Sequence, residues 1–200
     1  MAKANWVKVT PSSGSGNATV NVSSTAPHTG RTARTTTLTW KAANVANITR
    51  NVIQAGKLEY VDIADAASAD KAGKVVTISG VSNSAKLTFT LGDGDLNITL
   101  PATYTANSVS TSNGAAISGD PGASAEYPFS ISITVPANTT TSAKSRQIIV
   151  TNEAGEYDIC LLTSAAGDAY LNVELGDIKL GYEGTAVPVT VESNTSWTVE

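Results

Sequence analysis

The 200-residue sequence predicts an all-β protein built of tandem immunoglobulin-like β-sandwich modules. Short runs rich in Val, Ile, Thr, Leu and aromatic residues are bounded by Gly, Asn, Asp and Pro, which is typical of strands separated by tight turns. These turn signals recur about every 8–12 residues, as in a sandwich. The sequence also repeats itself with a period close to the length of one such module, and this repeat sets the domain organisation.

The predicted strands are residues 6–11, 18–24, 35–40, 48–54, 74–79, 86–91, 96–101, 129–136, 146–152 and 157–164. In residues 129–135, aromatic or aliphatic side chains alternate with Ser and Thr, so one face should be buried and the other wet. Residues 91–100 are predicted to form a hairpin that turns at Gly92, Asp93 and Gly94. Residues 62–73 permit a helix, but their Ala and Asp content favours a loop or a single turn.

The front of the repeating unit occurs twice. Residues 73–89 align without gaps on residues 184–200 at an offset of 111, and residues 59–63 align on residues 169–173 at an offset of 110. The period is therefore about 110 residues, the size of one immunoglobulin-like sandwich.

The rear of the unit is repeated as well. Residues 20–56 align on residues 133–167, and the aligned residues Arg34 and Arg146 differ by 112 positions. This divides the chain into a rear portion at residues 1–57, one complete module at residues 58–167 and a front portion at residues 168–200. We expect the natural chain to continue beyond Glu200; the alternative is that the missing half comes from the N-terminal end of another copy.

Several short motifs in order resemble the BACON family of immunoglobulin-like modules associated with Bacteroidetes. They are the front element "SNTSWTV" (193–199), the Trp6 strand followed by "PSSG" (11–14), Arg34 before an alternating Thr and aliphatic strand, and the closing "QAG" (54–56). The resemblance covers residues 1–57 and 168–200. The complete module departs from it, with Lys86 in the place of Trp197, "AAG" at 165–167 and an insertion at residues 105–119 that replaces the Trp strand.

The resemblance implies two settings. BACON modules occur in secreted bacterial proteins, where carbohydrate or mucin binding has been proposed, and in virion proteins of crAss-like phages of Bacteroidetes. The first ten residues contain no apolar stretch of signal-peptide length, so no secretory signal is predicted. With Met1 as the native start, synthesis in the cytosol and a place in a virion are favoured.

Catalytic and metal chemistry is not predicted, and no cofactor is expected. The single histidine, His28, excludes a site that needs two histidines, and without a base beside it no Ser or Cys nucleophile is activated. Asp93 and Asp95 begin like a calcium loop, but Tyr104 stands where a closing Glu belongs. Cys160 lies in an apolar run and is expected to be a buried hydrophobic residue.

Exposed aromatic side chains are the remaining route to ligand binding, because a sugar ring can stack on them. Trp40, Tyr104 and Tyr127 are the candidate glycan-stacking residues, whereas Trp6 and Trp197 are expected in the core because they are in phase with buried aliphatic residues.

The predicted function is a non-enzymatic structural or adhesive virion protein, such as a phage head fibre, a capsid decoration or a tail-associated protein. The alternative is a module that binds mucin glycans. The expected partners are capsid or other virion proteins, bound through residues 1–57, and sister copies in a homo-oligomer such as a trimer. Without a basic cluster or a membrane-length apolar run, neither nucleic acid nor a membrane is an expected partner.

Overall fold

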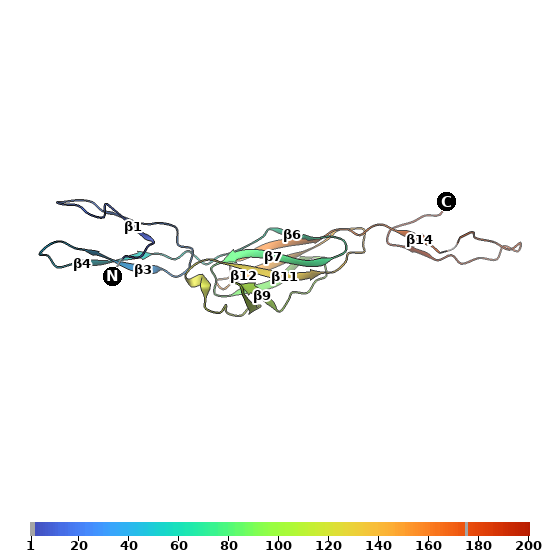
Figure 1. The fold of residues 1–200 in the computed structure, drawn as a ribbon. Helices are drawn as coiled ribbons and strands as arrows, with labels where there is room; N and C mark the ends of the chain where they lie inside the picture. Colours follow the sequence, from blue (N-terminus) through green and yellow to red (C-terminus); the bar gives the residue numbers. More distant parts are fainter. Residues whose placement is uncertain (1–2, 175) are drawn as a thin grey trace.

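The computed structural model describes residues 3–174 and 176–200, which form an elongated molecule with a wide body between two narrow ends (Figure 1). Met1, on which the expectation of cytosolic synthesis depends, lies outside the described residues. The regular elements are β1 (Val7–Thr10), β2 (Asn21–Ser24), β3 (Arg34–Trp40), β4 (Ile48–Gln54), β5 (Val61–Ile63), β6 (Ala66–Ala69), β7 (Lys74–Ser82), β8 (Leu87–Gly94), β9 (Thr103–Ala106), β10 (Val109–Ser112), the 3-10 helix η1 (Pro121–Ala123), β11 (Tyr127–Val135), β12 (Lys144–Asn152), β13 (Tyr157–Ser164), β14 (Leu171–Val173) and β15 (Val191–Ser193).

Two sheets make up the body, which we call the central unit (residues 58–167). One sheet has the strand order β10-β9-β11-β7-β5 and the other has the order β6-β13-β12-β8. One core cluster takes its side chains from both sheets. The predicted all-β sandwich class is thereby confirmed, because each sheet buries the apolar face of the other.

The alternation along β11 explains how this core is filled. Phe129, Ile131 and Ile133 are at most 2% exposed, while Ser132 and Thr134 between and beside them face solvent. A strand with period two presents one apolar face, and β11 lies in the middle of its sheet, where that face is covered. The predicted burial pattern of this strand is confirmed.

The predicted hairpin at residues 91–100 is wrong. Strand β8 continues to Gly94, and the residues that follow do not return beside it as a strand. The amides of Asp95 and Leu96 both donate to the Ser145 carbonyl at 2.9 Å, and the Asp95 carboxylate accepts from the Ser145 amide at 2.9 Å. These bonds draw the chain across the start of β12, so Leu96 reaches the core from an irregular segment.

Several short strands, β6, β9 and β10 among them, were absent from the sequence prediction. β6 lies in the segment expected to be a loop or turn, and it forms because it pairs in parallel with β13 at the edge of the sheet. β9 and β10 form a hairpin within the predicted insertion, with Asn107 and Ser108 at φ 47° and 65° in its turn. The local composition of these segments does not predict a strand, and they form strands because each pairs with a neighbouring strand.

Both narrow ends consist of two-stranded pairs. The N-terminal segment (residues 3–57) contains the pairs β1-β2 and β3-β4, and the C-terminal segment (residues 168–200, except 175) contains the pair β14-β15. They lie at opposite ends of the molecule (Figure 1). An isolated two-stranded pair is marginally stable in water, so each end lacks the cover that the central unit has.

Strand pairing relates the rear portion at residues 1–57 to its counterpart in the central unit by an offset of 110 residues. Arg34 pairs with Gln54 as Lys144 pairs with Ser164. The hydrogen bond from the Lys57 amide to the Gly30 carbonyl likewise has a counterpart from Gly167 to Thr140. The alignment of Arg34 on Arg146 is therefore wrong by two residues, because it matched side-chain type and ignored the strand partner.

Candidate functional site

The joint between the N-terminal segment and the central unit centres on Arg31. Its guanidinium forms a two-pronged ion pair with Asp120 and donates to the Asn83 carbonyl at 3.0 Å. The amides of Arg31 and Thr32 donate to the carbonyls of Gly122 and Ala123 at 2.9 and 3.0 Å. Asp120 thus fastens one segment to the next.

Asn83 is the other half of this joint and is fully buried. Its side-chain oxygen accepts from the Tyr60 amide at 2.9 Å, and its side-chain nitrogen donates to the Thr29 and Leu58 carbonyls at 3.2 and 3.1 Å. One amide side chain therefore binds the backbone on both sides of the boundary. An amide suits this place because it carries both donors and acceptors.

The same joint recurs between the central unit and the C-terminal segment. Asn194 accepts from the Tyr170 amide at 3.0 Å and donates to the Thr139 and Asp168 carbonyls at 2.9 and 2.8 Å. Each of these three backbone partners lies 110 positions after its counterpart at the Asn83 joint. The repeat seen in the sequence is therefore also a repeat of hydrogen bonds. Because the Asn83 and Asn194 joints lie at the two ends of the central unit, successive units follow one another along the molecule (Figure 1).

An open cleft of about 720 Å³ lies between the two strand pairs of the N-terminal segment. Its lining includes the apolar side chains of Val9, Val20, Leu38 and Trp40 as well as Lys3 and Lys41. Trp40 is 41% exposed. An accessible tryptophan face beside a lysine is compatible with a glycan, and a cleft with mixed polar and apolar lining between two strand pairs is equally compatible with a protein segment.

Tyr104 and Tyr127 do not fulfil the prediction of glycan stacking. They are 3% and 2% exposed, and the Tyr127 hydroxyl donates to the Ser84 carbonyl at 2.8 Å. The Tyr104 ring packs against Phe89, with the ring centroids 5.0 Å apart. Both rings point inward from β9 and β11, where burial raises their pKa, so neither has a face free for a sugar.

The two tryptophans expected in the core are not enclosed. Trp6 is half-buried, and the Arg34 guanidinium lies 4.6 Å from its ring centroid. Trp197 is 49% exposed. The prediction assumed that a second sheet faces these strands. Neither end segment has a second sheet among the described residues, so the two tryptophan side chains are left partly exposed.

The polar residues considered for chemistry have structural contacts. His28 Nε2 donates to the Thr32 carbonyl at 2.7 Å, close to the Arg31 joint. Cys160 is fully buried, as predicted, and burial raises the pKa of its thiol to about 11. Within residues 3–174 and 176–200, no three His, Cys, Asp or Glu side chains are grouped so as to hold a metal ion.

Comparison with protein-family models and with curated proteins finds no match to this chain. In the part of the chain that the structure describes, no helix is long and apolar enough to cross a membrane.

The pairing of Arg31 with Asp120 has no direct signal in the sequence, because the two residues are 89 positions apart. Asn83 and Asn194 could be found, since the "SN" dipeptide is common to both copies of the front portion. What sequence could not supply is their partners: the carbonyls of residues 29 and 139 are reached across a unit boundary.

Proposed function

We propose that the chain is a non-enzymatic structural and adhesive component of a virion: a phage head fibre, capsid decoration or tail-associated protein made of immunoglobulin-like modules. The observation that carries the proposal is the repeated joint. Two boundaries use the same asparagine-to-backbone bonds, and the units they connect follow one another along an elongated molecule (Figure 1). Such a joint suits a protein that projects from a surface, because it limits bending between units.

The resemblance to BACON modules of crAss-like phages supplies the setting of the proposal. Mass spectrometry of purified particles of such a phage, followed by cryo-electron microscopy of the same particles, tests it. We expect peptides of this chain in the purified particles and elongated density with a two-sheet unit on the shell or tail. Particles that infect normally but lack both the peptides and the density would contradict the virion role.

Glycan binding is the second candidate function, and the exposed face of Trp40 in the cleft favours it. We expect the chain to bind mucin glycans on an array and Trp40→Ala to lose at least about tenfold in affinity, since stacking on one ring contributes about 1–2 kcal/mol. Tyr157→Ala removes another exposed aromatic side chain, 65% accessible in the central unit, and serves as the matched control. A flat array response, or equal binding by the Trp40 and Tyr157 variants, argues against this function.

A further inference from the structure

The two ends of the molecule contain complementary sets of strands. In the central unit the pair β12-β13 lies between β8 and β6, and β11 pairs with β7, which in turn pairs with β5. The N-terminal segment has counterparts of the rear strands: β2 occupies the place of β11, and the pair β3-β4 corresponds to β12-β13. The C-terminal segment has the counterpart of the front pair, because β14-β15 corresponds to β5-β7. Each end therefore carries strands that the other end lacks.

The registers of these strands agree with the central unit. Leu38 pairs with Arg50 as Ile148 pairs with Cys160, at an offset of 110 on both strands. At the other end, Leu171 pairs with Ser193 as Val61 pairs with Ser82, at offsets of 110 and 111. Both ends are thus already shaped as the matching portions of the central unit.

One large apolar side chain at each end is exposed where the central unit has cover. Counted at the rear offset of 110, Trp40 corresponds to Val150, which is 0% exposed, while Trp40 is 41% exposed. Counted at the front offset of 111, Trp197 corresponds to the half-buried Lys86 and is 49% exposed. An exposed tryptophan at a core position of a repeat indicates a missing cover.

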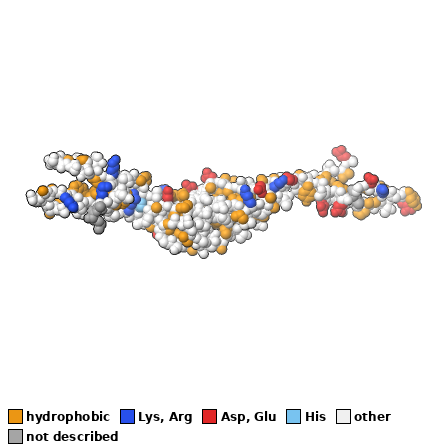
Figure 2. All heavy atoms as spheres, in the orientation of Figure 1, with side chains coloured by type: hydrophobic (Ala, Val, Ile, Leu, Met, Phe, Trp, Pro, Cys, Tyr) orange, Lys and Arg blue, Asp and Glu red, His pale blue; other side chains and the backbone are white. Residues whose placement is uncertain are grey.

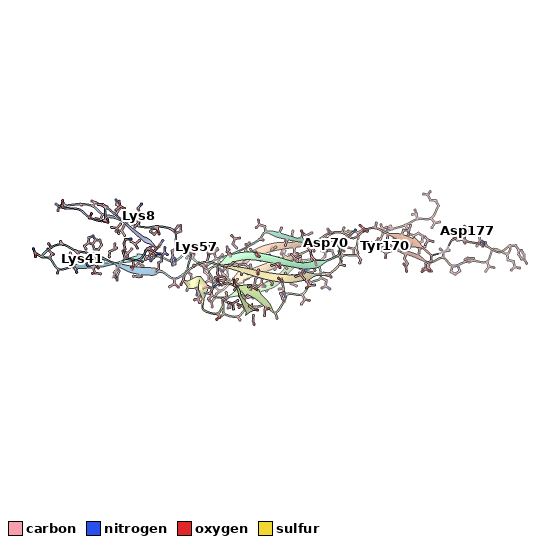
Figure 3. All side chains as sticks on the ribbon, in the orientation of Figure 1. Lys8, Lys41, Lys57, Asp70, Tyr170 and Asp177 are labelled. Atoms are coloured by element: carbon pink, nitrogen blue, oxygen red, sulfur yellow. The ribbon has the colours of Figure 1, made fainter. Side chains whose placement is uncertain are left out.

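Charge separates the two ends. Residues 1–57 contain seven Lys or Arg and no Asp or Glu, whereas residues 168–200 contain six Asp or Glu and one Lys. Figure 2 shows the basic side chains gathered at the N-terminal end and acidic side chains along the C-terminal end. Figure 3 places Lys8 and Lys41 at the first end and Asp177 at the second. Opposite charge favours contact between unlike ends and opposes contact between like ends.

A single chain cannot bring its own ends together, because the central unit lies between them (Figure 1). Two copies can, by placing the C-terminal segment of one against the N-terminal segment of the next. The free edges of β2, β3 and β4 would then pair with incoming strands, and such strand addition uses backbone hydrogen bonds for affinity. The contact joins two different surfaces, so it generates an open linear array and not a closed dimer.

We infer that copies of this chain assemble head to tail, with residues 168–200 of one copy and residues 1–57 of the next forming one composite sandwich unit. This deepens the proposed structural role and rests on it: a rod would consist of central units alternating with composite units. The cleft beside Trp40 is then the place of the incoming side chains of the C-terminal segment.

The test is the concentration dependence of mass for the full 200-residue chain, measured by analytical ultracentrifugation. We expect the wild-type chain to form a series of linear oligomers. Trp197→Asp disables only the C-terminal end and Trp40→Asp disables only the N-terminal end, so each variant alone is expected to associate at least about 100-fold more weakly, as loss of a central interface aromatic does. Raising the salt concentration should also weaken the wild-type association, because the ends carry opposite charge.

Mixing the two variants distinguishes this arrangement from others. The intact C-terminal end of Trp40→Asp can pair with the intact N-terminal end of Trp197→Asp, so the mixture is expected to form a dimer that grows no further. This rescue also shows that both variants are folded. Tyr157→Asp, an exposed aromatic residue of the central unit, is the matched control and should assemble as the wild type does.

If something other than a second copy covers the two end segments, the experiment gives a different result. A wild-type chain that stays monomeric at all concentrations overturns the inference and indicates that other protein covers the ends, such as further residues of a longer chain. Variants that fail to rescue each other overturn it in favour of contact between like ends. An assembling chain that is absent from purified particles would contradict only the virion role, and a monomeric chain found on particles would contradict only the assembly.

Discussion

Phe89→Ala is expected to destabilise the central unit by about 3–5 kcal/mol, the range for removing a large aromatic side chain from a closed core. Phe89 is 2% exposed, and its ring centroid lies 5.0 Å from that of Tyr104 and 5.9 Å from that of Phe129. The ring therefore joins the core contributions of β8, β9 and β11. Urea unfolding followed by far-ultraviolet circular dichroism measures the change.

Val199→Ala is the control at an uncovered position, because Val199 is 84% exposed. In the dilute chain it should change the free energy of unfolding by less than about 0.5 kcal/mol. Phe89→Leu, which keeps much of the volume, covers the case in which the alanine variant does not fold; we expect it to lose less than Phe89→Ala. Equal effects of the Phe89 and Val199 alanine variants would show that the Phe89 ring does not fill a closed core.

Asn83→Ala is expected to destabilise the chain by about 3 kcal/mol or more. The substitution removes three hydrogen bonds to backbone groups, and each partner left unpaired at a buried site costs about 1–3 kcal/mol. Because the bond to the Thr29 carbonyl crosses from the N-terminal segment to the central unit, the joint should loosen as well. Hydrogen exchange at the Tyr60 amide, whose acceptor is the Asn83 side chain, reports the local effect.

Asn194→Ala provides the comparison at the second joint, where the same bonds are exposed to solvent. Water can replace exposed hydrogen bonds, so this variant should lose about 1 kcal/mol or less in the dilute chain. If copies assemble as inferred, the Asn194 joint becomes covered and the penalty should grow in the assembled state. An Asn83 variant as stable as Asn194→Ala would show that the joint does not hold the units together.

Strand positions were predictable where the pattern was local. Residues 48–54 and 157–164 are strands with the predicted bounds, and the alternation in residues 129–135 gave the buried face of β11. The prediction failed where partners distant in sequence decide the structure. Residues 96–101 have a strand-like pattern, but the contacts with Ser145 hold the start of this segment off the β8 edge.

The candidate site was predictable only in part, for a related reason. Trp40 was expected to be accessible and is, because no sheet faces β3. Tyr104 and Tyr127 were expected to be accessible and are buried, because their rings point from β9 and β11 into the core between the two sheets. Whether an aromatic residue of this repeat is exposed depends on whether its unit has both sheets, and this is a property of the assembled structure.

A disulfide cross-link between two copies is the most direct test of the composite unit. In the central unit Thr88 lies opposite Thr151, and the corresponding residues of the two ends, at offsets of 111 and 110, are Val199 and Lys41. Residues opposite each other on antiparallel strands have Cα atoms about 4.5–5.5 Å apart, within the range that a disulfide spans. The native Cys160 is buried and does not compete.

The account predicts that chains with Val199→Cys, mixed with chains with Lys41→Cys and oxidised, give a linked dimer on a non-reducing gel. Thr35→Cys is the matched control. Thr35 lies on β3, the strand that ends at Trp40 just before Lys41, and it faces the same side as Lys41. It is about 20 Å from Lys41 along the strand direction. A dimer with Lys41→Cys and none with Thr35→Cys is the expected result. No dimer with Lys41→Cys, or equal dimer with both, would contradict head-to-tail completion of the unit.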